Sequence, residues 1–190
     1  VKKMLNILVI GTGMYSTGRG TDSYGTVLPA ISEWHRNNSN SKKVVFVGTN
    51  GSHSIASRRK AKQLAHDTGV NLDISFFPGP DVIDKDSYKL ALKEIPKPAC
   101  AIVVVPDHLH FQIVHDCLMN DLPVLVVKPL TPTVKEAKKL VDLAEERSLH
   151  VAVEFHKRYD KANLMIRDKI QSDVLGDLLY CWVEYSQRKS

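Results

Sequence analysis

A lysine ends one of the most apolar stretches of the chain. Val124–Val127 contains no polar residue, and Lys128 and Pro129 follow it directly. Such a run is typical of a parallel strand covered on both faces, and open α/β sheets bind ligands at the carboxyl ends of their strands. A lysine there can donate a charged hydrogen bond to an oxygen that gains negative charge during a reaction. We therefore expect Lys128 at a site; the alternative is a lysine that reaches from the strand end to solvent.

A pair of glycines follows another apolar run near the start of the chain. Gly11 and Gly13 come directly after Leu5–Ile10. In a dinucleotide-binding turn the first glycine permits the tight turn, and the second lets the backbone approach a pyrophosphate. A glycine pair alone is a weak signal, but it stands directly after a strand, as such a turn requires. The residues expected to hold the dinucleotide are Gly11, Thr12, Gly13, Met14 and Tyr15.

The third glycine of such a turn is missing, because its place is taken by Ser16. Gly25 precedes the next helical pattern and is the candidate for that role, so Ser16–Tyr24 is an insertion rich in hydroxyls and glycine. Arg19 is the cation of this insertion. We interpret the insertion as a flap over the phosphates of the ligand; the alternative is a solvated loop whose glycines only form turns.

The segment after the second apolar run bears on which nucleotide is bound. An acidic residue there normally holds the free ribose 2′-hydroxyl of NAD. No Asp or Glu occurs from Trp34 to His66, whereas basic residues cluster on the following helical pattern. This favours NADP over NAD, and it disfavours an S-adenosylmethionine methyltransferase. The expected contacts are Thr49, Asn50, Ser52 and Arg58. The alternative is a solvated basic helix face, with Asn50 bound to the plain ribose of NAD.

Two histidines follow the fourth apolar run, in the segment Pro106-Asp107-His108-Leu109-His110. Histidines two residues apart cannot share a helix face, and no further ligand has a suitable spacing, so we predict no metal site. Asp107 is placed to cap the helix that follows. The segment should lie at the carboxyl edge of the sheet, where ligands bind.

Six apolar runs alternate with helical patterns along the chain, which predicts a doubly wound α/β fold with a mostly parallel sheet. The expected strands are Leu5–Ile10, Val44–Val47, Ile74–Phe77, Ala101–Val105, Val124–Val127 and Val151–Phe155. Thr133 and Glu136 form a capping box that predicts a helix start, and Pro29 places another start near Gly25.

The end of the chain has a different pattern. Residues 178–185 alternate between apolar and other side chains, which predicts a strand of an antiparallel sheet with one covered face. This strand either folds back onto the main sheet or begins a second domain that is otherwise missing, and we favour the second possibility. We expect a dinucleotide-binding domain at 1–150, a connection at 151–175 and the start of the second domain at 176–190.

The composition narrows the possible partners and compartment. The 190 residues are 43% hydrophobic and 25% charged, and the net charge is +5. The aromatic residues are not interleaved with the basic ones, so we do not expect nucleic-acid binding. No run approaches the roughly 20 residues of a membrane span. The odd number of cysteines, 3, without a Cys-x-x-Cys pair indicates reduced thiols in a cytoplasmic protein.

Four segments together resemble a known family. They are PDHLH at 106–110, VKPLTPTVKEAKKLVDLAEE at 127–146, VAVEFHKRYD at 151–160 and LGDLLYCWVEYSQR at 175–188. In order along the chain, they resemble the glucose-fructose oxidoreductase, inositol dehydrogenase and rhizopine-catabolism family, the Gfo/Idh/MocA oxidoreductases. The resemblance implies a Rossmann nucleotide-binding domain, with the first strand of a second, antiparallel-sheet domain near residue 176.

The resemblance also implies roles for single residues. In this family the lysine reaches the nicotinamide ribose and the substrate oxygen, so Lys128 is the expected catalytic residue. Residues of the family motifs around the cofactor match Pro106, His108, His110, Lys128, Pro129 and Arg158. Three positions depart from the family pattern. Val127 replaces a glutamate, and His156 and Lys157 replace an asparagine and an arginine.

The function implied is NAD(P)-dependent hydride transfer to or from a sugar, cyclitol or related polyol. The residues that handle the substrate proton are usually contributed by the C-terminal domain, so we expect the 190-residue chain alone to bind dinucleotide without turnover. With that domain present we expect a homo-oligomer. The alternatives are a non-catalytic dinucleotide-binding regulator or sensor of the same fold and, less favoured, a basic scaffold that binds nucleic acid through its phosphates.

Overall fold

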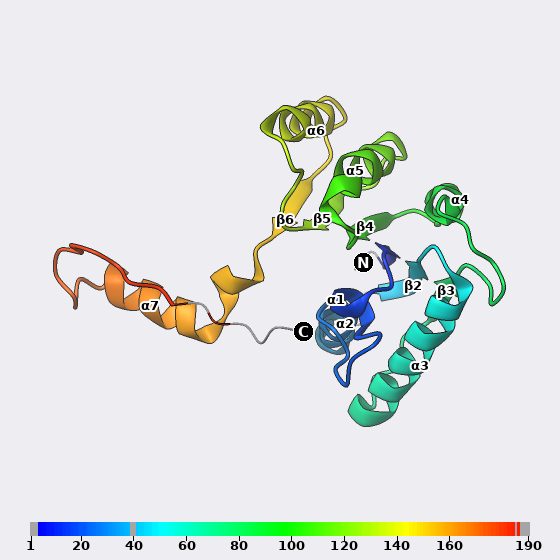
Figure 1. The fold of residues 1–190 in the computed structure, drawn as a ribbon, viewed down its shortest axis with the longest axis horizontal. Coiled ribbons are helices and arrows are strands. Elements are labelled where there is room, and N and C mark those ends of the chain that lie inside the picture. The colour runs from blue at the N-terminus through cyan, green and yellow to red at the C-terminus, as the bar shows by residue number, and fades with distance from the viewer. Residues whose placement is uncertain (1–3, 39–40, 185, 187–190) are drawn as a thin grey trace. The chain divides into compact units, whose positions relative to one another are not determined.

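Six parallel strands form a sheet in the order β3-β2-β1-β4-β5-β6 (Figure 1). The computed structural model describes residues 4–38, 41–184 and 186. The strands are β1 (Leu5–Ile10), β2 (Ser41–Val47), β3 (Ile74–Phe77), β4 (Ala99–Val103), β5 (Val124–Val127) and β6 (Val151–Glu154). The order reverses between β1 and β4, which creates a crevice at the carboxyl ends of these two strands. The predicted doubly wound α/β fold is confirmed.

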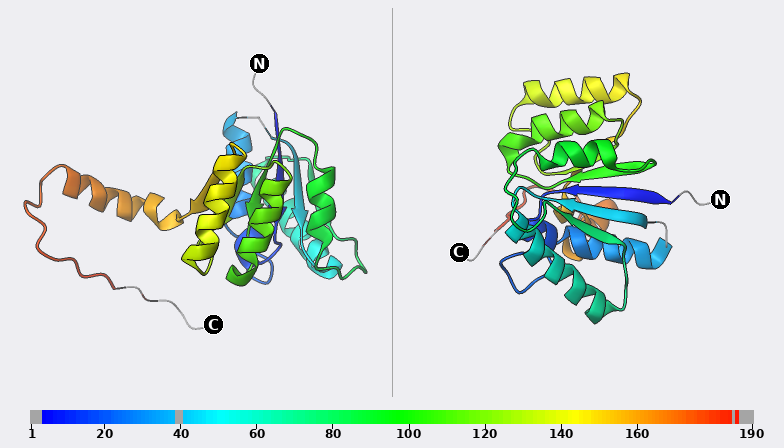
Figure 2. Two further views of the ribbon diagram at one scale, coloured as in Figure 1. Left: turned by 90° about the horizontal axis from the view of Figure 1, so that it is seen from above. Right: turned by 90° about the vertical axis from the view of Figure 1, so that its right-hand side faces the viewer.

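Helices cover both faces of this sheet. They are α1 (Met14–Thr17), α2 (Val27–Asn38), α3 (Gly51–Thr68), α4 (Ser87–Glu94), α5 (His110–Met119) and α6 (Val134–Glu146), with the 3₁₀ turn η1 (Asp107–Leu109) before α5. The 3₁₀ turn η2 (His156–Tyr159) and α7 (Lys161–Gln171) follow β6. Figure 2 shows α2 and α3 on one face and α4, α5 and α6 on the other. None of the helices in the described ranges is long and apolar enough to cross a membrane.

Two hydrophobic cores explain why the strands are apolar without alternation. Leu8 and Ile10 pack in the core beneath α4, α5 and α6, whereas Ile7 and Val9 pack in the core beneath α2. Successive residues of β1 therefore point into different cores, and both faces need apolar side chains.

Three strands, β1, β3 and β5, have the predicted bounds. β2 begins at Ser41 rather than Val44, β4 begins at Ala99 rather than Ala101, and β6 ends at Glu154 rather than Phe155. β4 was expected to reach Val105 but ends at Val103, which pairs with Ile10, the last residue of β1. Beyond Ile10 the neighbouring strand offers no further ladder partner, so apolar character alone does not extend the strand.

The helix starts follow local signals. α2 begins at Val27, so Pro29 lies in its first turn as predicted. The Thr133 side chain accepts a hydrogen bond from the Glu136 backbone N–H at 3.3 Å and caps α6. The predicted capping box is only half formed, because the Glu136 carboxylate accepts from the Thr133 hydroxyl at 2.8 Å.

The chain divides into two compact units, Val1–Glu154 and Phe155–Ser190. The second unit contains η2 and α7, and the Asp160 carboxylate caps α7 by accepting from the Asn163 backbone N–H at 2.8 Å. Residues 178–184 contain no strand, and Tyr185 lies outside the described residues. Alternation needs a partner strand before it forms a ladder. The second domain that this segment would begin stays a prediction.

Candidate functional site

The glycine turn lies at the carboxyl end of β1. The Gly11 N–H donates to the Val47 carbonyl at 2.8 Å, and Gly11 has a φ of 119°. A Cβ at Gly11 would lie 1.9 Å from the Val104 carbonyl oxygen, so only glycine fits there. Gly13 is the N-cap of α1, and a Cβ there would meet nothing within 4 Å. The first glycine is required by the protein's own packing, and the second leaves space open for a ligand.

The inserted loop is shorter than the sequence indicated. Ser16 and Thr17 are buried and belong to α1, which ends at Thr17 with Gly18 as its C-cap, so the loop begins only at Gly18. The Arg19 side chain returns to the glycine turn, where its Nε donates to the Thr12 carbonyl at 2.9 Å. A Cβ at Gly25 would lie 2.7 Å from the Met14 and Tyr15 carbonyls. Gly25 therefore permits the close packing against α1 that the missing third glycine would otherwise provide.

A cavity of about 620 Å³ opens beside the glycine turn, at the ends of β1, β2 and β4. Predicted site residues on its wall are Gly11, Thr12, Gly13, Thr49 and Pro106, together with Arg19. Five further wall residues are not predicted by the sequence patterns: His53, Lys85, Tyr88, Lys89 and Gln112. His53 follows the start of α3 by less than one turn, and this spacing could have indicated it. The other four come from α4, the loop before it and α5, which only the folded sheet brings to the crevice.

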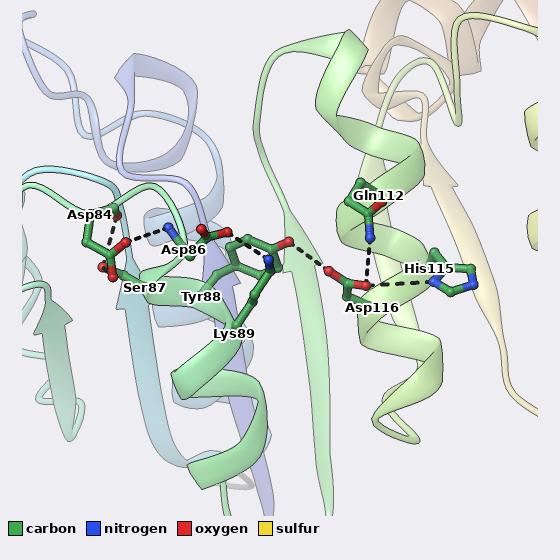
Figure 3. Close-up of polar contacts among 8 residues, drawn as sticks. All are labelled: Asp84, Asp86, Ser87, Tyr88, Lys89, Gln112, His115 and Asp116. Carbon is green, nitrogen blue, oxygen red and sulfur yellow. Dashed lines mark hydrogen bonds and ion pairs between the residues drawn. The ribbon is translucent and has the colours of Figure 1, made fainter.

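A hydrogen-bond network ties α4 to α5 in the wall of this cavity (Figure 3). The Tyr88 hydroxyl donates to the Asp116 carboxylate at 2.7 Å, and the Gln112 side-chain amide donates to the other oxygen of that carboxylate at 2.8 Å. Burial, followed by the hydrogen bond to Asp116, raises the pKa of Tyr88 well above its usual value. The phenol therefore remains a donor at neutral and mildly alkaline pH.

Replacing Tyr88 by phenylalanine should lower the free energy of unfolding by about 1–2 kcal/mol, because it leaves the Asp116 carboxylate without one of its donors. Urea denaturation measures this change. Tyr24→Phe is a matched control, since it removes a phenol that donates to the exposed carboxylate of Asp67. The control should leave the urea midpoint unchanged, and an equal loss in the two variants would contradict a specific role for the wall network.

The residues predicted to contact the nucleotide ribose do not all lie in one cavity. Thr49 lies in the cavity wall, and Asn50 caps α3 by accepting from the Ser52 N–H at 2.9 Å and the Ser52 hydroxyl at 2.7 Å. Arg58 lines a different cavity, with Ser32 of α2. The structure does not bring Arg58 to the cavity beside the glycine turn, because seven residues of helix carry it about 10 Å from the start of α3.

Lys128 stands at the carboxyl end of β5, as predicted, and its side chain is exposed. The carbonyl of the next residue, Pro129, lies 2.6 Å from Nδ1 of His110, and the Val105 carbonyl lies 2.9 Å from Nε2 of the same ring. His110 is fully buried. The expectation that it lines the cofactor is therefore corrected, because its ring joins the chain after β4 to the turn that carries Lys128.

The remaining predicted residues lie on exposed turns. His108 is exposed in η1, beside Pro106. Asp107 is the first residue of η1 and makes no capping hydrogen bond, so the predicted helix cap is wrong. A 3₁₀ turn precedes α5, and the helix therefore begins too late for Asp107 to cap it. Arg158 belongs to the second unit, with its guanidinium 4.9 Å from the centre of the Phe155 ring. Its cofactor contact stays a prediction.

A doubly wound parallel sheet with a glycine turn at its switch point defines a dinucleotide-binding α/β domain. A family model described as an oxidoreductase family with an NAD-binding Rossmann fold, named GFO_IDH_MocA, matches residues 5–155. The chain belongs to this Gfo/Idh/MocA oxidoreductase family.

Curated relatives and a solved structure agree with this assignment. An uncharacterized oxidoreductase of Schizosaccharomyces pombe is 32% identical over 103 residues, which are 54% of this chain and 27% of that protein. An inositol 2-dehydrogenase of Rubrobacter xylanophilus is 30% identical over 120 residues, 62% of this chain and 30% of that protein. A 3-ketoreductase from Actinomadura kijaniata, solved with NADP, has a TM-score of 0.64 at 19% identity and covers 92% of this chain and 46% of its own. The chain thus spans about a quarter to a third of the length of these curated relatives.

Proposed function

We propose that the chain binds NADP(H), and that the intact protein transfers a hydride between nicotinamide and a carbinol carbon of a sugar, cyclitol or related polyol. The observation that carries this proposal is that the glycine turn and Lys128 lie at the same carboxyl edge, after β1 and β5. The open space at Gly13 and the cavity of about 620 Å³ beside it fit a dinucleotide. The inositol 2-dehydrogenase relative supports the substrate class.

The residues of this chain would bind the dinucleotide, orient it and polarise the substrate oxygen. The turn at Gly11–Gly13 would accept the pyrophosphate, and the guanidinium of Arg19 lies beside it. The bound nicotinamide supplies the hydride acceptor or donor. Lys128 would donate a charged hydrogen bond to the substrate oxygen as that oxygen gains negative charge.

NADP is favoured over NAD by the side chains near the end of β2. His53 and Lys85 both line the cavity, and the Asp84 N–H donates to the Thr49 carbonyl at 2.9 Å, which holds the loop of Lys85 beside the β2 end. The carboxylate of Asp86, also in the wall, is paired with Lys89 at 2.9 Å. Two nitrogen donors without a free carboxylate beside them suit a 2′-phosphate better than a 2′-hydroxyl.

NADPH should therefore bind about ten-fold more tightly than NADH. His53→Ala should weaken NADPH binding by about five- to ten-fold and leave NADH binding unchanged, because only NADPH carries the 2′-phosphate. Fluorescence titration with both cofactors measures these affinities. Arg58→Ala is the matched control, since Arg58 lines another cavity and should affect neither cofactor. Tighter NADH binding by the wild type would contradict the preference.

A further inference from the structure

A contact joins the helix after β1, in the middle of the sheet, to β6 at one end of it. The Tyr15 hydroxyl donates to the Glu154 carboxylate at 3.1 Å, across 139 positions of sequence. Tyr15 belongs to α1, the helix directly after the glycine turn, and Glu154 is the last residue of β6. Because β4 and β5 lie between β1 and β6 in the sheet, this contact crosses both strands, on the face that carries α2.

Glu154, which accepts the hydrogen bond from Tyr15, lies beside the last residue of β5. Glu154 pairs in register with Val127, the residue directly before Lys128. Among the strands of the described ranges, only β6 ends in a charged residue. Val127, Glu154 and Tyr15 line one cavity of about 440 Å³, so the two registered side chains lie on the same face of the sheet. The carboxylate of this edge is thus provided by β6, while β5 provides the lysine.

The short helix after the glycine turn needs tertiary contacts, and this is one of them. α1 has 4 residues and no side-chain N-cap, and a helix this short is not stable by itself. It directly follows the glycine turn that would accept the pyrophosphate. Burial, and then the hydrogen bond and charge of Glu154, raise the pKa of Tyr15, so its phenol stays a donor at neutral pH.

We propose that Tyr15 and Glu154 form a positioning pair for the nicotinamide half of the dinucleotide. The pair fixes α1, and with it the glycine turn, relative to the end of β6, which lies beside the end of β5 and Lys128, where the nicotinamide half would lie. This inference rests on the proposed function. The adenosine half would lie at the other side of the switch point, beside β2, and would not depend on the pair.

The test compares a whole cofactor with its adenosine fragment. Tyr15→Phe and Glu154→Leu in the intact protein should each weaken NADPH binding by about five- to ten-fold and leave the affinity for 2′,5′-ADP unchanged. The losses in the double variant should be less than additive, because both substitutions remove the contact between Tyr15 and Glu154. Asp67→Ala is the control, since it removes another carboxylate that accepts from a phenol, that of Tyr24, at the far end of α3, and should not affect NADPH.

Equal weakening of NADPH and 2′,5′-ADP would overturn the inference, since it would indicate general damage to the site; unchanged NADPH binding would overturn it too. Tyr15→Phe removes one hydroxyl and keeps the ring packing, so it carries the test if Glu154→Leu fails to fold. A wild-type protein that binds neither ligand would instead refute the proposed function. The two failures are therefore distinguishable.

Discussion

Replacement of Lys128 by methionine is expected to lower kcat of the intact protein by about 10²- to 10³-fold. The substitution removes a charged donor from the place where the substrate oxygen gains negative charge, and it keeps the length of the side chain. NADPH affinity should change by no more than about three-fold, because the pyrophosphate and adenosine contacts remain. Steady-state kinetics with a panel of cyclitols and sugars, together with cofactor titration, separates the two effects.

Lys135→Met provides the matched control for this variant. Lys135 is an exposed lysine in the first turn of α6, so its replacement should leave kcat unchanged. A Lys128→Met protein that keeps kcat within about three-fold of the wild type would remove Lys128 from the reaction. If the wild-type protein binds NADPH but turns over no carbinol or carbonyl substrate, the non-catalytic sensor becomes the better interpretation of the same fold.

Replacement of Gly11 by alanine is expected to lower the free energy of unfolding by more than about 3 kcal/mol. Two causes act together. The φ of 119° is strained for any L side chain, and the new methyl group would lie 1.9 Å from the Val104 carbonyl oxygen, which cannot move without disrupting the chain after β4. Urea denaturation followed by circular dichroism measures the loss.

A second glycine separates these two causes. Gly69, which ends α3, has a φ of 69°, but a Cβ there would meet nothing within 4 Å. Gly69→Ala should therefore lose only about 1 kcal/mol, from backbone strain alone. Equal losses in the two variants would contradict the close approach of Gly11 to the end of β4.

Much of the sheet and of its carboxyl edge could be predicted from the sequence, because local signals determine where strands and turns end. The ends of β1 and β5 follow from where apolar runs stop, and the turn at Gly11–Gly13 follows from glycines placed directly after a strand. Lys128 could be placed at the edge for the same reason. Its environment could not, because the pairing of Val127 with Glu154 depends on strand register between segments far apart in sequence.

The other differences between the predicted and the observed site also arise from contacts between segments far apart in the sequence. Arg58 is predicted from a basic cluster on the helix after the second strand, but helical rise carries it past the crevice to another cavity. His110 was assigned by its motif, but a side chain at a helix start can point into the protein as well as toward a ligand. Lys85 and Tyr88 join the wall only because the chain crosses the sheet edge between β3 and α4. No local pattern carries that information.

The central claim, that the glycine turn binds a nicotinamide dinucleotide, is tested most directly by titrating NADPH into the wild type and Gly13→Ala. We predict saturable binding by the wild type. Gly13→Ala should keep its thermal stability, because its new methyl group would meet nothing within 4 Å, and should bind NADPH about ten-fold more weakly, because the group enters the space of the pyrophosphate. Gly79→Ala, equally free of contacts but outside the cavity, should bind like the wild type. Absence of saturable wild-type binding, or unchanged binding by Gly13→Ala, would contradict the claim.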